Sequence, residues 1–279
     1  VAWFCRRWGV PYVLETLGMV RPQVRSLWKK RFYRLLAGRR MMEGAAALVA
    51  TSEHELDELV ASGFAAERIH LRRNGLDFDE FAALPPRGAF RQELGIGDDE
   101  LLVLFLGRLS FIKGLDLLVQ AFAGVPPRAR LVIAGPDDGD GLLTAIKPFE
   151  SERIRIHGPI YEKQKLQAFA DADVFVLPSR SESFGNAAAE AIACNVPVLL
   201  TDRCGIAPLI RDRIGLVVPC EVSRIREGLA RLLGDTELHA QFRAQCPKVA
   251  MELSWDEPVT QMEALYEQVI AKNMLCTAS

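Results

Sequence analysis

The chain has 279 residues, of which 49% are hydrophobic, and this is enough for one large domain or two smaller ones with buried cores. Its 34 basic and 36 acidic residues nearly balance, so the chain has no overall positive electrostatic field of the kind that attracts nucleic acid. The six cysteines form no C-x-x-C pair, so we expect no zinc knuckle and a reducing, cytoplasmic location. No apolar run approaches the roughly 20 residues of a transmembrane helix.

The amino-terminal part shows only a few β-rich runs. Short strands are predicted at residues 11–14, 45–50 and 69–71. Ser52 and Glu55 form an S-x-x-E capping box, which predicts a helix that starts there and ends near Gly63. Because so few strands make no free-standing sheet, we expect residues 1–76 to be the remnant of a domain that begins upstream of Val1.

Residues 21–40 contain eight basic side chains and no acid. With apolar residues interleaved, the stretch could be an amphipathic helix on an anionic membrane, peripheral to the bilayer. It could equally be a solvated helix face that packs on its own domain through its apolar side.

Residues 77–98 are rich in Pro and Gly, and we expect them to form an interdomain linker. From residue 99 to 250, short apolar runs alternate with helical patterns, which predicts a doubly wound α/β domain with a parallel sheet. Its strands are expected at residues 101–106, 131–134, 154–157, 174–177, 198–201 and 216–218. Helical patterns follow at 222–233, 236–250 and 258–272, and we expect the segment 251–279 to cross back to the amino-terminal domain.

The turn after the first of these strands carries two cations between glycines. Arg108 follows Gly107, and Lys113 precedes Gly114 at the predicted start of a helix. Glycines let the backbone approach a ligand, and a helix amino terminus favours anions, so the turn suits a diphosphate. The alternative is an ordinary solvated surface turn.

A second polar loop follows the strand at 174–177. Glu182 lies in this loop and Glu190 lies eight residues later, in the predicted helix. Carboxylates at a helix start often serve only to cap it. Here the loop is built of small residues around Gly185, so both carboxylates could accept hydrogen bonds from the vicinal hydroxyls of a sugar or ribose.

These elements occur in a recognisable order. The Arg108 and Lys113 turn is followed by Ile-Ala-Gly, then by His-Gly-x-Ile, and then by P-S-x-x-E-S-F-G-x4-E-A. The chain resembles the retaining family 4 glycosyltransferases, which have the GT-B fold.

The resemblance implies that Arg108 and Lys113 hold the donor diphosphate and stabilise the leaving group, with Glu182 facing the sugar. It implies donor contacts from a further set: Gly107, the main chain near Phe184, Gly185 and Asn186, the ribose-binding Glu190, and His157 to Ile160 beside the base. The sequence departs from the family where Leu17 replaces a histidine and Asn195 replaces a glycine.

The implied reaction is transfer of a hexosyl unit, with retention, to a saccharide or lipid-linked acceptor, as in polysaccharide biosynthesis. We expect a UDP-sugar donor ahead of a GDP-sugar, and no metal or other cofactor. Two alternatives stay open. One is a non-catalytic protein that binds a sugar nucleotide or a partner, and the other is a sugar-nucleotide epimerase on the same fold.

Overall fold

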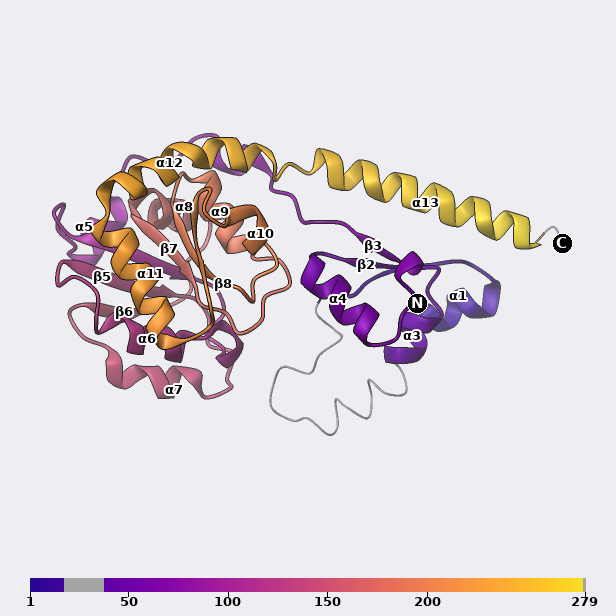
Figure 1. Cartoon of the computed structure of the whole chain (residues 1–279), viewed down its shortest axis with the longest axis horizontal. Coiled ribbons are helices and arrows are strands. Elements are labelled where there is room, and N and C mark those ends of the chain that lie inside the picture. Colours follow the sequence, from indigo (N-terminus) through magenta and orange to yellow (C-terminus); the bar gives the residue numbers. More distant parts are fainter. Residues whose placement is uncertain (18–37, 278–279) are drawn as a thin grey trace. The chain divides into compact units, whose positions relative to one another are not determined.

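The computed structural model describes residues 1–17 and 38–277. These residues form two compact units (Figure 1). Unit 1 comprises Val1–Gly75 and Trp255–Ser279, and unit 2 comprises Leu76–Ser254. Most of the basic stretch at 21–40 lies outside the described residues. Within the described part, no helix is long and apolar enough to cross a membrane.

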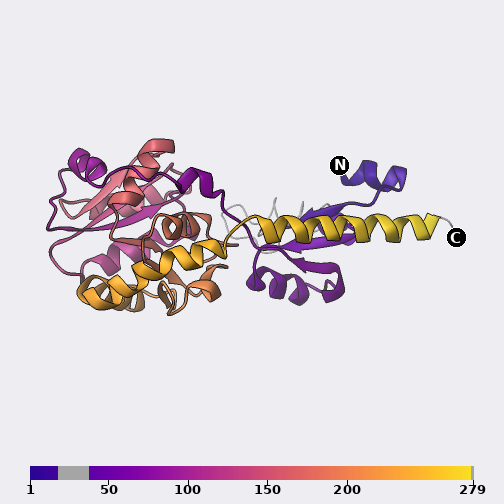
Figure 2. The ribbon, with the colours of Figure 1, turned by 90° about the horizontal axis from the view of Figure 1, so that it is seen from above.

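Unit 1 is built on a parallel sheet of three strands in the order β1-β2-β3. Its elements are α1 (Ala2–Trp8), β1 (Val13–Glu15), α3 (Arg39–Glu43), β2 (Ala47–Ala50), α4 (Glu53–Ala61), β3 (Ile69–Leu71) and α13 (Asp256–Thr277). Side chains of β2 alternate between two cores. Leu48 packs with Leu59 of α4, whereas Val49 packs with Leu265 of α13. The last helix therefore covers one face of the amino-terminal sheet (Figure 2).

Helix α4 starts at the predicted capping box, because the Ser52 hydroxyl accepts a hydrogen bond from the Glu55 backbone at 3.2 Å. The Glu55 carboxylate is buried and accepts hydrogen bonds from the Thr51 backbone and the Thr16 hydroxyl, both at 2.8 Å. It thereby ties the carboxyl end of β1 to that of β2.

Unit 2 contains the predicted doubly wound sheet. Its parallel strands are β4 (Leu101–Leu106), β5 (Ala129–Ala134), β6 (Ile154–His157), β7 (Val174–Leu177), β8 (Val198–Thr201) and β9 (Gly215–Val218). Their order in the sheet is β6-β5-β4-β7-β8-β9. The chain thus winds outward from β4 in one direction and from β7 in the other. The junction between β4 and β7 is the topological switch point, where such sheets bind ligands.

Helices cover both faces of this sheet (Figure 1). One group of packed helices consists of α6 (Leu115–Phe122), α7 (Leu142–Ile146) and α11 (Val222–Gly234). Two further packed pairs are α5 (Ala89–Leu94) with α8 (Glu162–Asp171) and α9 (Asn186–Ala193) with α12 (Thr236–Met251). Right-handed crossovers require that α6 and α9 lie on opposite faces, because their connections run in opposite directions along the sheet.

Asn195, where the resemblance implies a glycine, lies two residues after Ala193, the last residue of helix α9. Its φ of 61° is in the left-handed region, which asparagine tolerates better than most other residues with a side chain. Glycine would adopt this backbone conformation without strain.

Residues 77–98, which we expected to be a linker, instead pack into unit 2. They form the short helix η3 (Phe78–Phe81) and helix α5. The buried Asp171 accepts hydrogen bonds from the backbone N–H groups of Phe90 and Arg91, at 2.7 and 2.9 Å. Asp173 forms an ion pair with the buried Arg91 at 2.6 Å. These long-range carboxylate contacts outweigh the Pro-rich and Gly-rich composition that suggested a linker.

Candidate functional site

Two loops meet at the switch point of unit 2. One follows β4 at residues 107–114, and the other follows β7 at residues 178–185. The Arg180 backbone N–H donates to the Ile112 carbonyl at 2.7 Å, so the loops run side by side. The strand order thus brings together the two polar loops that the sequence singled out.

Glycine is required where the β4 loop enters helix α6. Gly114 has a φ of 68°, in the left-handed region. A Cβ atom at this position would also lie far inside the van der Waals distance of the Pro178 carbonyl oxygen. The backbone conformation and the close approach of the β7 loop therefore both exclude a side chain at Gly114.

Lys113 forms an ion pair with Glu182 across the two loops. Each side chain is only 17% exposed, so little water screens the pair. The Glu182 backbone is held by the loop after β8, because its N–H donates to the Arg203 carbonyl and its carbonyl accepts from the Gly205 N–H, both at 3.0 Å. The sequence-predicted cation and carboxylate are thus in direct contact.

Arg108 lies at the start of the loop that carries Lys113. Its guanidinium is 66% exposed and lies 3.2 Å from Asp138. Its neighbour Leu109 donates a backbone hydrogen bond to the Pro136 carbonyl at 2.8 Å, which fixes the start of the loop. Arg108 is therefore anchored at its backbone, while its charge remains accessible to a ligand.

Glu190 lies in helix α9 and pairs with Lys165 of α8 at 3.4 Å. Burial raises the pKa of the Glu190 carboxyl, and the nearby Lys165 charge opposes this rise. Lys165 also lies 3.7 Å from Glu80. It lines a cavity of about 700 Å³ between α8 and the segment around residues 80–85. In this structure Glu190 thus pairs with Lys165 rather than with Lys113.

The remaining predicted site residues differ in how far their side chains are exposed. Ile160 and Phe184 are 4% and 3% exposed and belong to the core of unit 2, so only their backbone could face a ligand. Asn186 is exposed at the first position of α9, next to Gly185, whose φ of 121° again suits glycine. His157 is half-buried, and its Nδ1 lies 3.0 Å from the Gly158 carbonyl oxygen.

Arg180 and Asp116 form a further pair at these loops that no sequence pattern indicated. Arg180 lies in the β7 loop and forms a two-fold hydrogen-bonded ion pair with Asp116 of α6, with both distances at 2.7 Å. The only sequence signal was an acid in the first turn of the helix after the Lys113 turn. That position also suits ordinary helix capping, so it did not point to Arg180.

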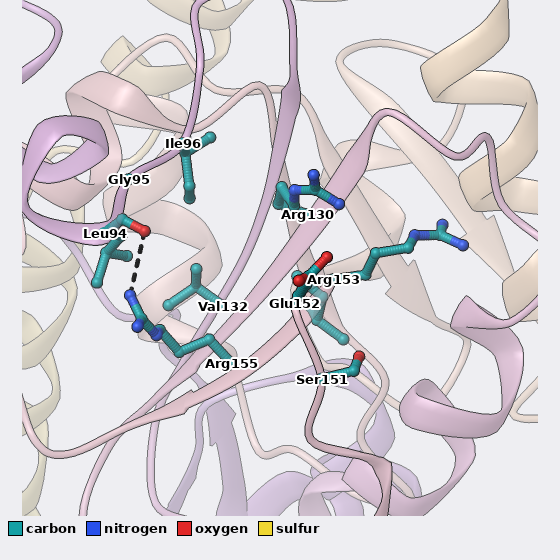
Figure 3. A pocket seen from close by; sticks show the side chains of 10 residues that line it. Leu94, Gly95, Ile96, Arg130, Val132, Ser151, Glu152, Arg153 and Arg155 are labelled. Carbon is teal, nitrogen blue, oxygen red and sulfur yellow. Dashed lines mark hydrogen bonds between the residues drawn. The ribbon is translucent and has the colours of Figure 1, made fainter.

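A separate pocket lies away from these loops (Figure 3). It has a volume of about 320 Å³ and lies near the amino ends of β5 and β6, lined by Arg130, Arg153 and Arg155 among others. Since ligands of doubly wound sheets bind at the carboxyl ends, this pocket is not part of the candidate site. Within residues 1–17 and 38–277, no cluster of His, Cys, Asp or Glu is arranged to hold a metal ion.

Comparison with known proteins identifies the family. Residues 86–249 match the model of the glycosyl transferases group 1, and residues 1–75 match that of the glycosyl transferase 4-like domain. The chain belongs to the group 1 glycosyl transferases. This confirms the predicted glycosyltransferase family of enzymes.

Curated relatives of this glycosyltransferase include two proteins named D-inositol 3-phosphate glycosyltransferase. The one from Xylanimonas cellulosilytica is 31% identical over 94% of this chain and 67% of its own length. The one from Mycobacteroides abscessus is 31% identical over 96% of this chain and 63% of its own length. The chain thus spans about two thirds of the length of these relatives.

Solved structures confirm the GT-B fold of this glycosyltransferase. Sucrose-phosphate synthase from Thermosynechococcus elongatus has a TM-score of 0.81 and 25% identity, covering 97% of this chain and 71% of that one. Anabaena HepE in complex with UDP-glucose has a TM-score of 0.79 and 21% identity, covering 97% of this chain and 75% of that one.

Substitution of Gly114 should distinguish two destabilising effects, the steric clash caused by the close approach of the loops and the strain of a left-handed backbone. Gly139 has a φ of 72°, close to that of Gly114, but a Cβ atom added at Gly139 would have no heavy atom within 4 Å. Gly139→Ala should therefore cost only about 1–2 kcal/mol of unfolding free energy. Gly114→Ala should cost about 1–3 kcal/mol more, because the β7 loop must move. Urea unfolding of both variants measures the difference, and equal costs would contradict the described contact.

Proposed function

We propose that unit 2 of this glycosyltransferase binds a nucleotide diphosphate sugar at the carboxyl ends of β4 and β7. The reaction is transfer of the hexosyl unit to a saccharide or lipid-linked acceptor, with retention at the anomeric carbon. One observation carries the proposal, namely that Lys113 and Glu182 pair across the switch point. This is where doubly wound sheets bind their ligands.

Lys113 and Arg108 supply the positive charge that the leaving group needs. As the bond between sugar and phosphate breaks, negative charge grows on the departing diphosphate, and fixed cations in a partly buried site stabilise it. Arg108 suits a fork-like grip on phosphate oxygens, whereas Lys113 acts as a point charge. The amino end of helix α6, directly after Lys113, adds its dipole.

The two glutamates would hold the sugar and the ribose. Glu182 lies beside Lys113, so in the proposed complex its carboxylate faces the hexose next to the diphosphate. Glu190 would accept hydrogen bonds from the ribose hydroxyls. In a retaining transfer the departing phosphate can take the acceptor proton on the same face of the sugar, so the mechanism requires no pair of hydrolytic carboxylates.

We propose UDP as the carrier and, beside the saccharide and lipid-linked classes, the phosphorylated cyclitol D-inositol 3-phosphate as the first acceptor to test. The UDP choice is supported by HepE, which was solved with UDP-glucose. The acceptor choice is supported by the names of the curated relatives. Arg108 and Lys113 supply the charge for the diphosphate from the chain itself, so the proposed mechanism invokes no metal.

Binding of uridine and UDP distinguishes the two halves of the proposed donor site. Lys113→Ala should weaken UDP about ten- to a hundredfold, the equivalent of roughly 1.5–3 kcal/mol, and leave uridine unchanged. Glu190→Gln should weaken both ligands by a similar factor, because it acts on the ribose. Calorimetric titration of each variant with each ligand measures these effects.

Lys147→Ala is the matched control for the loss of one lysine charge from unit 2. Lys147 is 63% exposed and pairs with Glu150, so neither affinity should change. Burial raises the pKa of Glu190 above the ordinary value of a glutamate, and the ionised carboxylate is the form that accepts the ribose hydroxyls. Uridine affinity should therefore fall as the pH is lowered through that raised value, and Glu190→Gln should remove this dependence. Equal losses of uridine and UDP in Lys113→Ala would remove Lys113 from the diphosphate site.

Turnover tests the reaction itself. Incubation of the chain with UDP-glucose and D-inositol 3-phosphate should release UDP and give a product with the α-configuration of the donor, as read by the anomeric coupling constant in proton NMR. A β-linked product would contradict retention. Donor isomerised without acceptor would indicate an epimerase, and binding of UDP-glucose without turnover would contradict the choice of D-inositol 3-phosphate as its acceptor.

A further inference from the structure

Arg180 connects the two loops of the candidate donor site through its side chain. Its Nη1 and Nη2 atoms donate to the two carboxylate oxygens of Asp116, each at 2.7 Å. Such two-fold pairs fix the planes of both groups as well as their separation. The side chains of Arg180 and Asp116 are only 27% and 25% exposed. Asp116 lies in the first turn of α6, just after Lys113.

Arg180 also holds the turn just before Lys113. Its Nη1 donates to the Phe111 carbonyl at 2.8 Å, and its guanidinium lies 4.0 Å from the centre of the Phe111 ring. Its backbone N–H donates to the Ile112 carbonyl at 2.7 Å. The contacts of this single residue thus bracket Lys113 on both sides along the chain.

The charge of Arg180 is already compensated. The hydrogen bonds that the guanidinium donates to Asp116 raise the pKa of Arg180, so the guanidinium stays charged, with a carboxylate against two of its nitrogens. Lys113 is likewise paired with a carboxylate, that of Glu182 in the β7 loop. Arg180 therefore lies beside the proposed diphosphate site with its donors committed to Asp116 and to the Lys113 turn.

We infer that Arg180 is a positioning residue for the donor diphosphate, acting through Asp116 and the 111–113 turn to hold Lys113 against the β7 loop. This inference rests on the proposed function, since it assigns a supporting role within the same site. Without these contacts, the loop that carries Lys113 would become ordered only when the donor binds. The entropic cost of that ordering would weaken the affinity for the donor.

Arg180→Met and Asp116→Ala test the inference together, because each breaks the same ion pair from one side. Both should weaken UDP about tenfold and leave uridine unchanged, since Glu190 does not contact either residue. Arg180→Lys should restore only part of the UDP affinity, because lysine cannot make the two-fold contact. Arg224→Met, which removes an exposed charge on α11, is the control and should change neither affinity.

Asp116→Ala separates positioning from direct binding of phosphate by Arg180. If Arg180 itself gripped the diphosphate, removal of Asp116 would free its donors, and UDP affinity would stay the same or rise. That result would overturn the inference. The double variant Lys113→Ala, Arg180→Met gives a second test. If Arg180 acts through Lys113, UDP should bind the double variant no more weakly than it binds Lys113→Ala.

Additive losses in the double variant would show that Arg180 acts independently of Lys113 and would likewise overturn the inference. Melting temperatures without ligand and the uridine affinity report whether each variant is folded. If Lys113→Ala weakens UDP but Arg180→Met does not, the inference fails and the proposed function stands. If the unaltered chain binds neither UDP nor uridine, the proposed function fails, and the role of Arg180 falls with it.

Discussion

The contact between the backbones of Gly114 and Pro178 is the constraint on which the candidate site depends. The strand order places β4 beside β7, and the loops that follow these strands then meet without an intervening side chain. This approach allows Arg180 to reach Asp116 and Lys113 to reach Glu182. A larger residue at Gly114 would separate the loops, and both ion pairs would have to stretch or break.

The paired charges of the site have a cost and a benefit. Ion pairs with low exposure lose hydration, and their mutual attraction offsets that loss only when the geometry is good. Lys113 and Glu182 meet this condition through loops that are fixed at several backbone positions. In the proposed complex the diphosphate offers Lys113 a second anion, so the cation is already in place when the donor arrives. A preorganised cation of this kind stabilises the leaving group without reorganisation during the reaction.

Sequence patterns predicted the sheet of unit 2 well because its strands are short apolar runs between turn residues. Strands β4, β6, β7 and β8 have the predicted bounds, and β5 begins two residues earlier, at Ala129. The structure also brings together Lys113 and Glu182, two residues that the sequence patterns had singled out separately. Their roles toward a donor stay predictions, because they depend on a ligand.

The sequence failed where a residue acts through a distant partner. Residues 77–98 have the composition of a linker, yet Asp171 and Asp173 hold helix α5 in unit 2. Similarly, nothing near Arg180 in the sequence indicated that Asp116 would meet it. Nor did the sequence indicate the pairing of Glu190 with Lys165, which joins α9 to α8. Local patterns carry no information about such contacts until the topology is known.

A crystal structure of the chain with UDP would test the central claim most directly. We predict that the diphosphate lies at the carboxyl ends of β4 and β7, with a phosphate oxygen within hydrogen-bond distance of Lys113 Nζ and the ribose hydroxyls against Glu190. Diphosphate density elsewhere on unit 2, such as in the arginine-lined pocket at the amino ends of β5 and β6, would contradict it.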